Sequence, residues 1–382
     1  MQHSNKCGYW HTAAILVTLV VSLVAIFLGL FTQPEDIMSL KALFAGGTVY
    51  RNIVWYTKGM KEFTRGGYET AARNFNDEDL DVDISNLSYM ITGSNSGLGK
   101  CTALELAKRG ATVHMVCRNE TRGLKAKDEV INESGNEKVH LHLLDLSKPR
   151  DIVKFARDFV SSEKQLDVLV NNAGCMIHEY KLDENELETN FATNTLGTYI
   201  LTTELLPSLS RSSSAQVVTV SSGGMYTEKL DPYDLNLAAR QDKFDGTFAY
   251  GQNKRQQVVM SRLWAVKYPN IHFSSMHPGW AATVAVQTSM PDFSAKMGDK
   301  LRTPEQGADT ITWLCIAARN LKLPSGLFFQ DRTAVSEHLP LARSHSSDVE
   351  EATLMERLEQ LKSKFLPSED QPTEQLKLKS AF

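Results

Sequence analysis

Residues 92–99 read TGSNSGLG, and this stretch decides the fold. It follows the apolar run LSYMIT at residues 87–92 and opens GLGKCTALELAKRG, which has helical periodicity. Gly93 permits a tight turn, Gly97 lets the backbone approach a pyrophosphate, and Gly99 lets the helix pack closely on the strand. A helix N-terminus also attracts an anion. Strand, glycine turn and helix in this order predict a phosphate-binding loop, although glycines can also be ordinary turn residues.

The same alternation of short apolar runs and helical segments continues from residue 86 to about residue 335. Alternating strands and helices predict parallel β-α-β units, and therefore a single α/β doubly wound sheet of about seven strands with helices on both faces. Such a sheet binds its ligand at the carboxyl ends of its strands. The runs that predict strands are LSYMIT (87–92), TVHMVC (112–117), VHLHLLD (139–145), LDVLVN (166–171), QVVTVS (216–221), IHFSSMH (271–277) and GLFFQ (326–330).

The composition excludes several classes of function. The chain has 382 residues with 41 basic and 45 acidic side chains, so no basic field is present that would bind nucleic acid. Apolar residues make up 42% and charged residues 23%, as in an ordinary globular protein. The five cysteines are scattered without a C-x-x-C pair, and the ten histidines show no metal-binding spacing. We therefore expect no disulfide framework and no metal site.

Residues 12–31, TAAILVTLVVSLVAIFLGLF, contain no charged side chain. Because a helix of about 20 such residues matches a hydrocarbon core about 30 Å thick, they predict one transmembrane helix. A buried core helix and a cleaved signal peptide are alternatives, the latter opposed by the length and by the lack of an A-x-A-like site. Met38 is also a candidate start of the working protein, which would remove this segment. The few flanking charges leave the orientation open.

Three further segments flank the predicted sheet. Residues 39–70 carry apolar and aromatic residues at helical spacing, with basic residues on the remaining surface. They predict an amphipathic segment that packs on the main domain or, alternatively, lies on an anionic membrane surface. Residues 74–83 are acidic and rich in turn residues, which is typical of a linker. Residues 346–382 predict one acidic helix followed by a polar, disordered end.

Several short motifs follow the glycine turn in order along the chain. They are NNAG at residues 171–174, Asn194 in a helical segment, Ser221-Ser222 after a strand, Tyr250-x-x-x-Lys254, and HPG at residues 277–279. Together with the spacing T-G-x-x-x-G-x-G, this set resembles the short-chain dehydrogenase/reductase superfamily. Each motif is common alone, but the ordered set over about 250 residues is specific. The resemblance implies a Rossmann-type sheet and an oxidoreductase that transfers hydride to or from a nicotinamide cofactor.

Four residues are expected to carry the reaction: Asn194, Ser222, Tyr250 and Lys254. Tyr250 and Lys254 are four residues apart at the start of a predicted helix, so both side chains project from one face. A nearby ammonium favours a phenolate, so the spacing predicts a lowered pKa for Tyr250 and a role as general acid or base. From the spacing alone, an exposed pair of side chains is the alternative. The resemblance implies that Ser222 hydrogen-bonds the substrate oxygen, that Lys254 also binds the nicotinamide ribose, and that Asn194 holds a proton relay through water.

The resemblance also implies where the cofactor lies. Asp145 would meet the adenine, the NNAG run would pass under the adenine ribose, and the turn after the sixth strand would surround the nicotinamide carboxamide. An ordinary loop is the alternative for that turn. The full set of expected cofactor-binding residues is Thr92, Gly93, Ser94, Asn95, Ser96, Gly97, Leu98, Gly99, Arg118, Asp145, Asn171, Asn172, Ala173, Gly174, Tyr250, Lys254, Pro278, Gly279 and Thr283.

The end of the second predicted strand indicates which nicotinamide is used. NAD-binding sites place an acid there, whereas NADP-binding sites place an arginine that holds the 2′-phosphate. Here Cys117 stands at the strand end and Arg118 follows it. We therefore favour NADP(H) over NAD(H), with a solvated surface arginine as the alternative.

The substrate can be predicted only as a class. The loops after the fourth, fifth and sixth strands are apolar, which suits a lipophilic carbonyl or alcohol such as a retinoid, steroid or fatty aldehyde. Folded lids or a homodimer contact explain such loops equally well. The apolar residues are Met176, Met225, Tyr226, Phe244, Phe248, Trp280, Met290 and Phe293.

The cellular setting and the function each have an alternative. Unpaired cysteines and a glycosylation sequon at Asn119, beside Arg118, favour a domain in the cytosol. We expect a membrane-associated protein with its catalytic domain facing the cytosol, or a soluble cytosolic protein if Met38 is the start. The alternative function, from another class, is a membrane-tethered nucleotide-binding adaptor without significant catalysis.

Overall fold

Eight strands form one sheet in the computed structural model, which describes residues 47–367 and residue 370. Their order across the sheet is β3-β2-β1-β4-β5-β6-β7-β8. The first seven strands are parallel, and only β8 is antiparallel to its neighbour β7. The strands are β1 (Ser88–Thr92), β2 (Thr112–Cys117), β3 (Val139–Leu143), β4 (Val168–Asn171), β5 (Gln216–Val220), β6 (His272–Met276), β7 (Leu327–Gln330) and β8 (Thr333–Ala334).

The predicted doubly wound α/β sheet is confirmed, and each of its seven predicted strands lies within the apolar run that predicted it. The central strands β1, β4, β5 and β6 are buried along their whole length, as expected for a parallel sheet covered on both faces. Strand β8 was not predicted. It has two exposed residues, which is too short for any hydrophobic periodicity to register.

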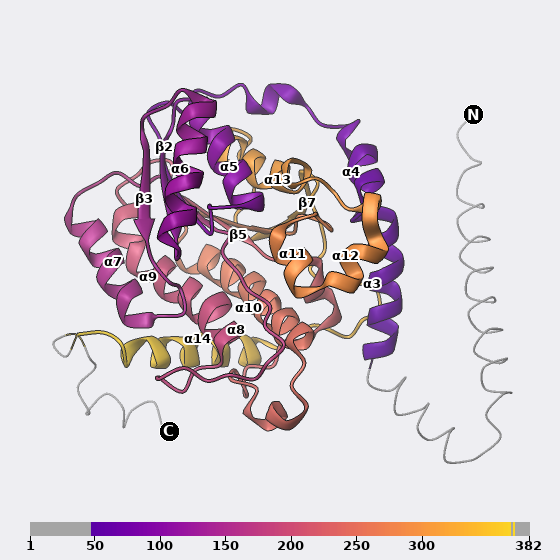
Figure 1. The fold of residues 1–382 in the computed structure, drawn as a ribbon. Helices are drawn as coiled ribbons and strands as arrows, with labels where there is room; N and C mark the ends of the chain where they lie inside the picture. The colour runs from indigo at the N-terminus through magenta and orange to yellow at the C-terminus, as the bar shows by residue number, and fades with distance from the viewer. Residues whose placement is uncertain (1–46, 368–369, 371–382) are drawn as a thin grey trace, which may run out of the picture. The chain divides into compact units, whose positions relative to one another are not determined.

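Helices cover both faces of the sheet (Figure 1). One face packs against α5 (Gly97–Lys108), α6 (Glu120–Ser134) and α13 (Pro304–Ala317). The other packs against α7 (Pro149–Ser161), α9 (Gly197–Leu209) and α10 (Gly246–Lys267). Each face therefore has its own hydrophobic core. Short elements complete the connections: η1 (Asp77–Leu80), α8 (Thr189–Phe191), the π-helix η2 (Ala192–Leu196), η3 (Gly223–Thr227), η4 (Ala238–Lys243), α11 (Val284–Ser289), α12 (Pro291–Met297) and η5 (Gly298–Lys300).

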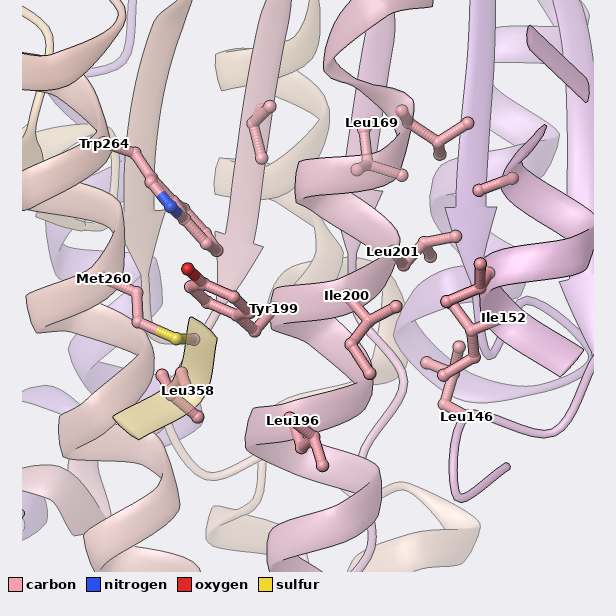
Figure 2. Packing of buried hydrophobic residues seen from close by; sticks show 14 of the residues in the cluster. Leu146, Ile152, Leu169, Leu196, Tyr199, Ile200, Leu201, Met260, Trp264 and Leu358 are labelled. Carbon is pink, nitrogen blue, oxygen red and sulfur yellow. The ribbon is translucent and has the colours of Figure 1, made fainter. Parts of the chain in front are cut away.

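The acidic C-terminal helix α14 (Asp348–Ser363) covers the outer side of α9 and α10. Figure 2 shows Leu358 of α14 beside Tyr199 of α9 and Met260 of α10, and Leu358 is fully buried. The Tyr199 hydroxyl donates a hydrogen bond to the Glu359 carboxylate at 2.6 Å. A capping box at Ser347 starts the helix. The C-terminal helix is therefore an integral part of the core on this face.

Among the described residues, the α-helices α3 (Thr48–Glu62) and α4 (Arg65–Ala72) come before the sheet. The chain divides into two compact units, residues 1–53 and 54–382, and the second unit contains the sheet together with α3 from Val54 onward. Within the second unit Phe63 is fully buried, so this part of the predicted amphipathic segment packs on the main domain. The predicted transmembrane segment 12–31 lies outside the described residues. None of the helices that the structure describes is long and apolar enough to cross a bilayer.

The strand order places a ligand site between β1 and β4. From β1 the chain first builds outward through β2 to β3, and it then crosses back to β4 on the other side of β1. The connections leaving β1 and β4 therefore diverge, and doubly wound sheets bind their ligands at the carboxyl ends of such a pair of strands. The glycine turn after β1 and the NNAG run after β4 both lie at this edge.

Candidate active site

The glycine turn after β1 is fixed to the NNAG run after β4 by hydrogen bonds. Thr92 Oγ1 accepts from the backbone N–H groups of Asn172 and Ala173, both at 3.0 Å. The Asn172 side-chain amide donates to the Thr92 carbonyl at 2.8 Å. Gly93 has a φ of +66°, and a Cβ there would lie 2.9 Å from Ala173 Cα. Position 93 therefore requires glycine. The hydrogen bonds hold the glycine turn and the NNAG run side by side.

The N-terminus of α5 is open for a phosphate group. Ser96 precedes the helix, but its side chain makes no capping hydrogen bond, so the first-turn N–H groups are not satisfied by a side-chain cap. Gly97 has a φ of +53°, and a Cβ there would lie 3.3 Å from Thr283 Cγ2. A Cβ at Gly99 would lie 2.5 Å from Asn172 Nδ2, which leaves no room for a larger residue. These features fit the pyrophosphate of a dinucleotide.

The adenosine end of the expected site lies at the carboxyl ends of β2 and β3. Cys117 is buried and its Sγ lies 3.7 Å from Ser94 Oγ of the glycine turn, whereas Arg118 is exposed. Burial raises the pKa of the Cys175 thiol to about 11, and the Arg118 guanidinium is among the groups near enough to lower it. Asp145 Oδ1 accepts hydrogen bonds from the backbone and hydroxyl of Ser147. Arg118 is therefore exposed at the end of β2 and near enough to Cys175 to act on it electrostatically.

Tyr250 and Lys254 lie in the first turns of α10, on one face as their spacing predicts. Lys254 is 2% exposed, and its Nζ donates to the Val220 carbonyl at 2.8 Å and to Gln257 Oε1 at 3.0 Å. The same Nζ lies 5.4 Å from the centre of the Tyr250 ring. Ser222 follows β5, accepts a hydrogen bond from the Gly224 N–H at 3.1 Å, and interacts with the Tyr250 side chain. The structure therefore brings Ser222, Tyr250 and Lys254 together.

The electrostatics differ from the expectation based on spacing. Burial raises the pKa of Tyr250 to about 12, and hydrogen bonding with Ser222 only partly opposes this rise. Burial also lowers the pKa of Lys254 to about 8. The predicted lowering of the Tyr250 pKa is wrong for this structure, because burial penalises the phenolate more than its surroundings favour it. Tyr250 is therefore a protonated phenol at neutral pH.

Asn194 lies in the π-helix η2 and is fully buried near Lys254. Its side-chain oxygen accepts from the Cys175 N–H, and its amide donates to the Cys175 carbonyl, both at 2.8 Å. The Asn194 carbonyl accepts from Gln257 Nε2 at 2.6 Å. A Cβ at Gly174 would lie 3.2 Å from Asn194 Oδ1 and 3.4 Å from Lys254 Nζ. The NNAG run, Asn194 and Lys254 therefore meet at one point.

Two expected cofactor positions, Asn171 and Pro278, have polar groups that bond within the protein. The Asn171 side chain is 2% exposed and its amide donates to Thr202 Oγ1 of α9 at 2.9 Å, so it points away from the loop surface. In the turn after β6, the Pro278 carbonyl accepts from Arg302 Nη1 at 3.2 Å, and Gly279 has a φ of +71°. Thr283 caps α11 by accepting from the Val286 N–H. Asn95 lies in the glycine turn, whereas Leu98 lies in the first turn of α5 and packs against the core that this helix shares with α13.

Part of the expected substrate lining is instead buried core. Met225, Tyr226 and Trp280 are 0%, 1% and 8% exposed and pack in one hydrophobic cluster with Phe63. The loop residues that remain partly exposed are Met176, Phe244, Phe248, Met290 and Phe293. The buried three form the base beneath the loops and do not line an open pocket.

Sequence analysis missed three contributors to the site. Gln257 holds both Lys254 and Asn194, and its spacing of three residues from Lys254 in a helix was a usable signal. Phe63 and Arg302 reach the site from distant parts of the chain, and no local pattern marks them. In the part of the chain that the structure describes, no group of three or more His, Cys, Asp or Glu side chains could hold a metal ion.

Comparison with known proteins identifies the family. The family described as short chain dehydrogenase matches residues 88–230. The chain is 52% identical over 318 residues to human "Dehydrogenase/reductase SDR family member 12", covering 83% of this chain and 99% of that protein. It is 35% identical over 272 residues to human "Retinol dehydrogenase 12", covering 70% of this chain and 84% of that protein. A crystal structure of an uncharacterized Mycobacterium paratuberculosis protein matches with a TM-score of 0.59 and 28% identity, over 74% of this chain and 96% of that chain. The chain therefore belongs to the short-chain dehydrogenase/reductase family, whose members are oxidoreductases acting on CH–OH and C=O groups.

Proposed function

We propose that this protein is an NADP(H)-dependent oxidoreductase that interconverts a lipophilic carbonyl compound and its alcohol. The observation that carries the proposal is the meeting of Ser222, Tyr250, Lys254 and Asn194 beside the uncapped N-terminus of α5. A proton donor, an oxygen-binding hydroxyl and a buried cation thus surround one position at the carboxyl edge of the sheet. No observation on the described residues favours the non-catalytic adaptor.

The residues support carbonyl reduction by proton donation. Bound nicotinamide would supply the hydride. Tyr250, with a pKa of about 12, keeps its proton at neutral pH and can give it to the carbonyl oxygen as negative charge develops there. Ser222, which contacts Tyr250, can hydrogen-bond the same oxygen and orient it. Lys254, with a pKa of about 8, is mostly charged at pH 7 and stabilises the phenolate left behind.

The substrate class rests on chemistry and on relatives. Five apolar or aromatic side chains stay partly exposed in the loops around the site, which suits a lipophilic substrate. Two relatives are named retinol dehydrogenase, and retinol is a lipophilic alcohol. A panel of retinoids, steroids and fatty aldehydes with NADPH tests the class. NADPH binding without turnover of any compound would favour the adaptor instead.

Arg118 is proposed to select NADP(H), and its reversal should weaken NADPH binding. Arg118 is exposed at the end of β2, and the preceding position is a buried cysteine in place of an acid. A hydrogen bond between charged groups contributes about 1.5–3 kcal/mol, so we expect Arg118→Asp to raise the Kd for NADPH by about 10- to 100-fold. Fluorescence titration with NADPH and with NADH measures both dissociation constants. The Kd for NADH should stay the same or decrease in this variant.

Arg122→Asp is the matched control for that titration. Arg122 is also exposed, lies one turn further along in α6, and undergoes the same change of charge. NADPH binding should fall much less in this variant, because Arg122 lies in α6 and not at the end of β2, where an arginine that selects NADP stands. If both variants bind NADPH equally well, Arg118 does not hold the 2′-phosphate.

Membrane association is proposed from residues 12–31 alone. Their uncharged sequence is long enough for one span. Carbonate extraction of the full-length chain tests it, with a chain starting at Met38 for comparison. Release of both forms into the soluble fraction would exclude the anchor.

A further inference from the structure

The guanidinium of Arg302 joins three separate parts of the chain. The side chain is 1% exposed and forms a bidentate ion pair with Asp331, with N–O distances of 2.6 and 2.9 Å. Its remaining N–H groups donate to the carbonyls of Glu62 at 2.6 Å, Thr64 at 3.3 Å and Pro278 at 3.2 Å. Glu62 and Thr64 form the connection between α3 and α4, ahead of the sheet. A buried, fully bonded arginine of this kind fixes geometry.

The backbone continues the same link. The Trp280 N–H donates to the Phe63 carbonyl at 2.8 Å, and the Arg302 N–H donates to the Trp280 carbonyl at 2.8 Å. A Cβ at Gly279 would collide with the Arg302 side chain and the Phe63 carbonyl, so the α3–α4 connection lies directly against the turn after β6. The turn and this connection are therefore held together by direct contacts.

The Phe63 ring extends the contact to Ser222. Its centre lies 4.6 Å from that of His277 and 5.7 Å from that of Trp280. A Cβ at Gly223, the residue after Ser222, would lie 3.0 Å from the Phe63 ring. Phe63 is therefore packed between the serine loop and the turn that follows β6.

That turn forms one wall of the site. Thr283 lies against Gly97 of the phosphate-binding turn, because a Cβ at Gly97 would be 3.3 Å from Thr283 Cγ2. A Cβ at Gly307 would touch both Leu98 of the same turn and Pro278. The segment from Pro278 to Thr283 thus faces the N-terminus of α5 on one side and reaches Ser222 through Phe63 on the other. Any shift of this segment changes the space between the phosphate site and the reacting groups.

We propose that Phe63 and Arg302 are positioning residues for the dehydrogenase reaction, through which the α3–α4 connection holds the wall from Pro278 to Thr283. This inference rests on the proposed function, because the wall is taken to contact the bound nicotinamide. It makes the helices ahead of the sheet part of the catalytic unit. Neither residue touches the reacting groups, so both act through the backbone that they hold.

The test compares Arg302→Lys with a matched arginine. Arg332 forms a similar bidentate pair with Asp309, at 2.6 and 2.9 Å, and also contacts the segment ahead of the sheet by lying over the Phe75 ring. It has no contact with the turn after β6. Both lysine variants keep the charge but lose the two-pronged hydrogen bonding. Thermal unfolding of each variant measures the structural loss that the two should share.

Only the Arg302→Lys variant is expected to affect the cofactor. Its Kd for NADPH should rise about tenfold, the effect of about 1.4 kcal/mol, whereas Arg332→Lys should stay within about twofold. Phe63→Leu, which keeps the buried position apolar but removes the ring, should show the same rise if Arg302→Lys fails to fold. With saturating NADPH, kcat should fall by a larger factor than the KM for the carbonyl changes, because the segment that the variants displace lies against the proposed cofactor site.

The outcomes separate this inference from the proposed function. If the wild-type protein does not bind NADPH, the proposed function is wrong and the inference falls with it. If the wild type binds NADPH and Arg302→Lys and Phe63→Leu bind it equally well, the inference alone is overturned. An equal loss of NADPH affinity in Arg332→Lys would also overturn it. The loss would then result from lower stability of the fold and not from displacement of the wall from Pro278 to Thr283.

Discussion

The Tyr250→Phe variant should lose about 10²- to 10⁴-fold in kcat, the usual contribution of a positioned general acid. Phenylalanine keeps the ring packed against Lys254 and Ser222 but removes the hydroxyl proposed to donate the proton. The reaction would then require a proton from water. The Kd for NADPH should stay unchanged, because the hydroxyl is not needed to hold the cofactor in place. Steady-state kinetics and fluorescence titration on the same preparation measure both quantities.

Tyr199→Phe is the matched control for this variant. Tyr199 is also a buried tyrosine with a bonded hydroxyl, but its partner is Glu359 on the far side of α9. Removal of that hydroxyl should cost about 1–3 kcal/mol of unfolding free energy and leave kcat unchanged. Turnover by Tyr250→Phe at more than about a tenth of the wild-type rate would show that another group donates the proton.

The pattern of short apolar runs predicted the sheet because central parallel strands are buried on both faces. Runs such as TVHMVC and QVVTVS are too short for helices and are bounded by turns, which leaves the strand as the one consistent assignment. The glycine turn was predictable for a similar reason, since the positive φ of Gly93 and Gly97 restricts the residue type. Local geometry therefore constrained both features.

The parts that sequence analysis missed depend on distant contacts. Phe63 meets Trp280 more than two hundred positions away, and Arg302 bonds both Glu62 and Asp331. No short-range pattern marks such pairs. The same limit explains the error in the Tyr250 pKa: the spacing to Lys254 was correct, but spacing does not show how deeply either side chain is buried. Burial is a property of the whole fold.

Replacing Lys254 with methionine should abolish efficient turnover and at the same time change how stability depends on pH. Burial lowers the pKa of this lysine from 10.5 to about 8. Below pH 8, the charged Lys254 side chain therefore lowers the free energy of unfolding by about 3 kcal/mol. Between pH 8 and 10.5 the unfolded chain binds more protons at this site than the folded chain. Stability contributed by this site therefore rises with pH through that window.

The methionine variant lacks this rise. The difference between the two proteins therefore gives the contribution of Lys254 to the pH dependence of stability. Other groups, such as the partly buried Tyr250 and Cys175, have raised pKa values and give the opposite slope, but they are present in both proteins. Urea unfolding at pH 7.5 and at pH 10 gives the free energy of unfolding of both proteins. Between these two pH values we expect it to increase by about 2 kcal/mol more in the wild type than in the methionine variant. The exposed Lys267 lies on the same helix, and its change to methionine should leave the wild-type slope in place.

The same burial that destabilises Lys254 is what makes it useful. A cation with 2% exposure acts on Tyr250 and on bound substrate through little water, so its field is strong at the moment when the phenol gives up its proton. Its removal should therefore lower kcat by at least about 10²-fold. The variant should nevertheless be no less stable than the wild type at pH 7, because the lost penalty offsets the hydrogen bonds to Val220 and Gln257, each of which contributes about 1 kcal/mol. A clear drop in stability at pH 7 together with an unchanged pH slope would show that the lysine is well solvated, and it would remove the electrostatic argument for its role.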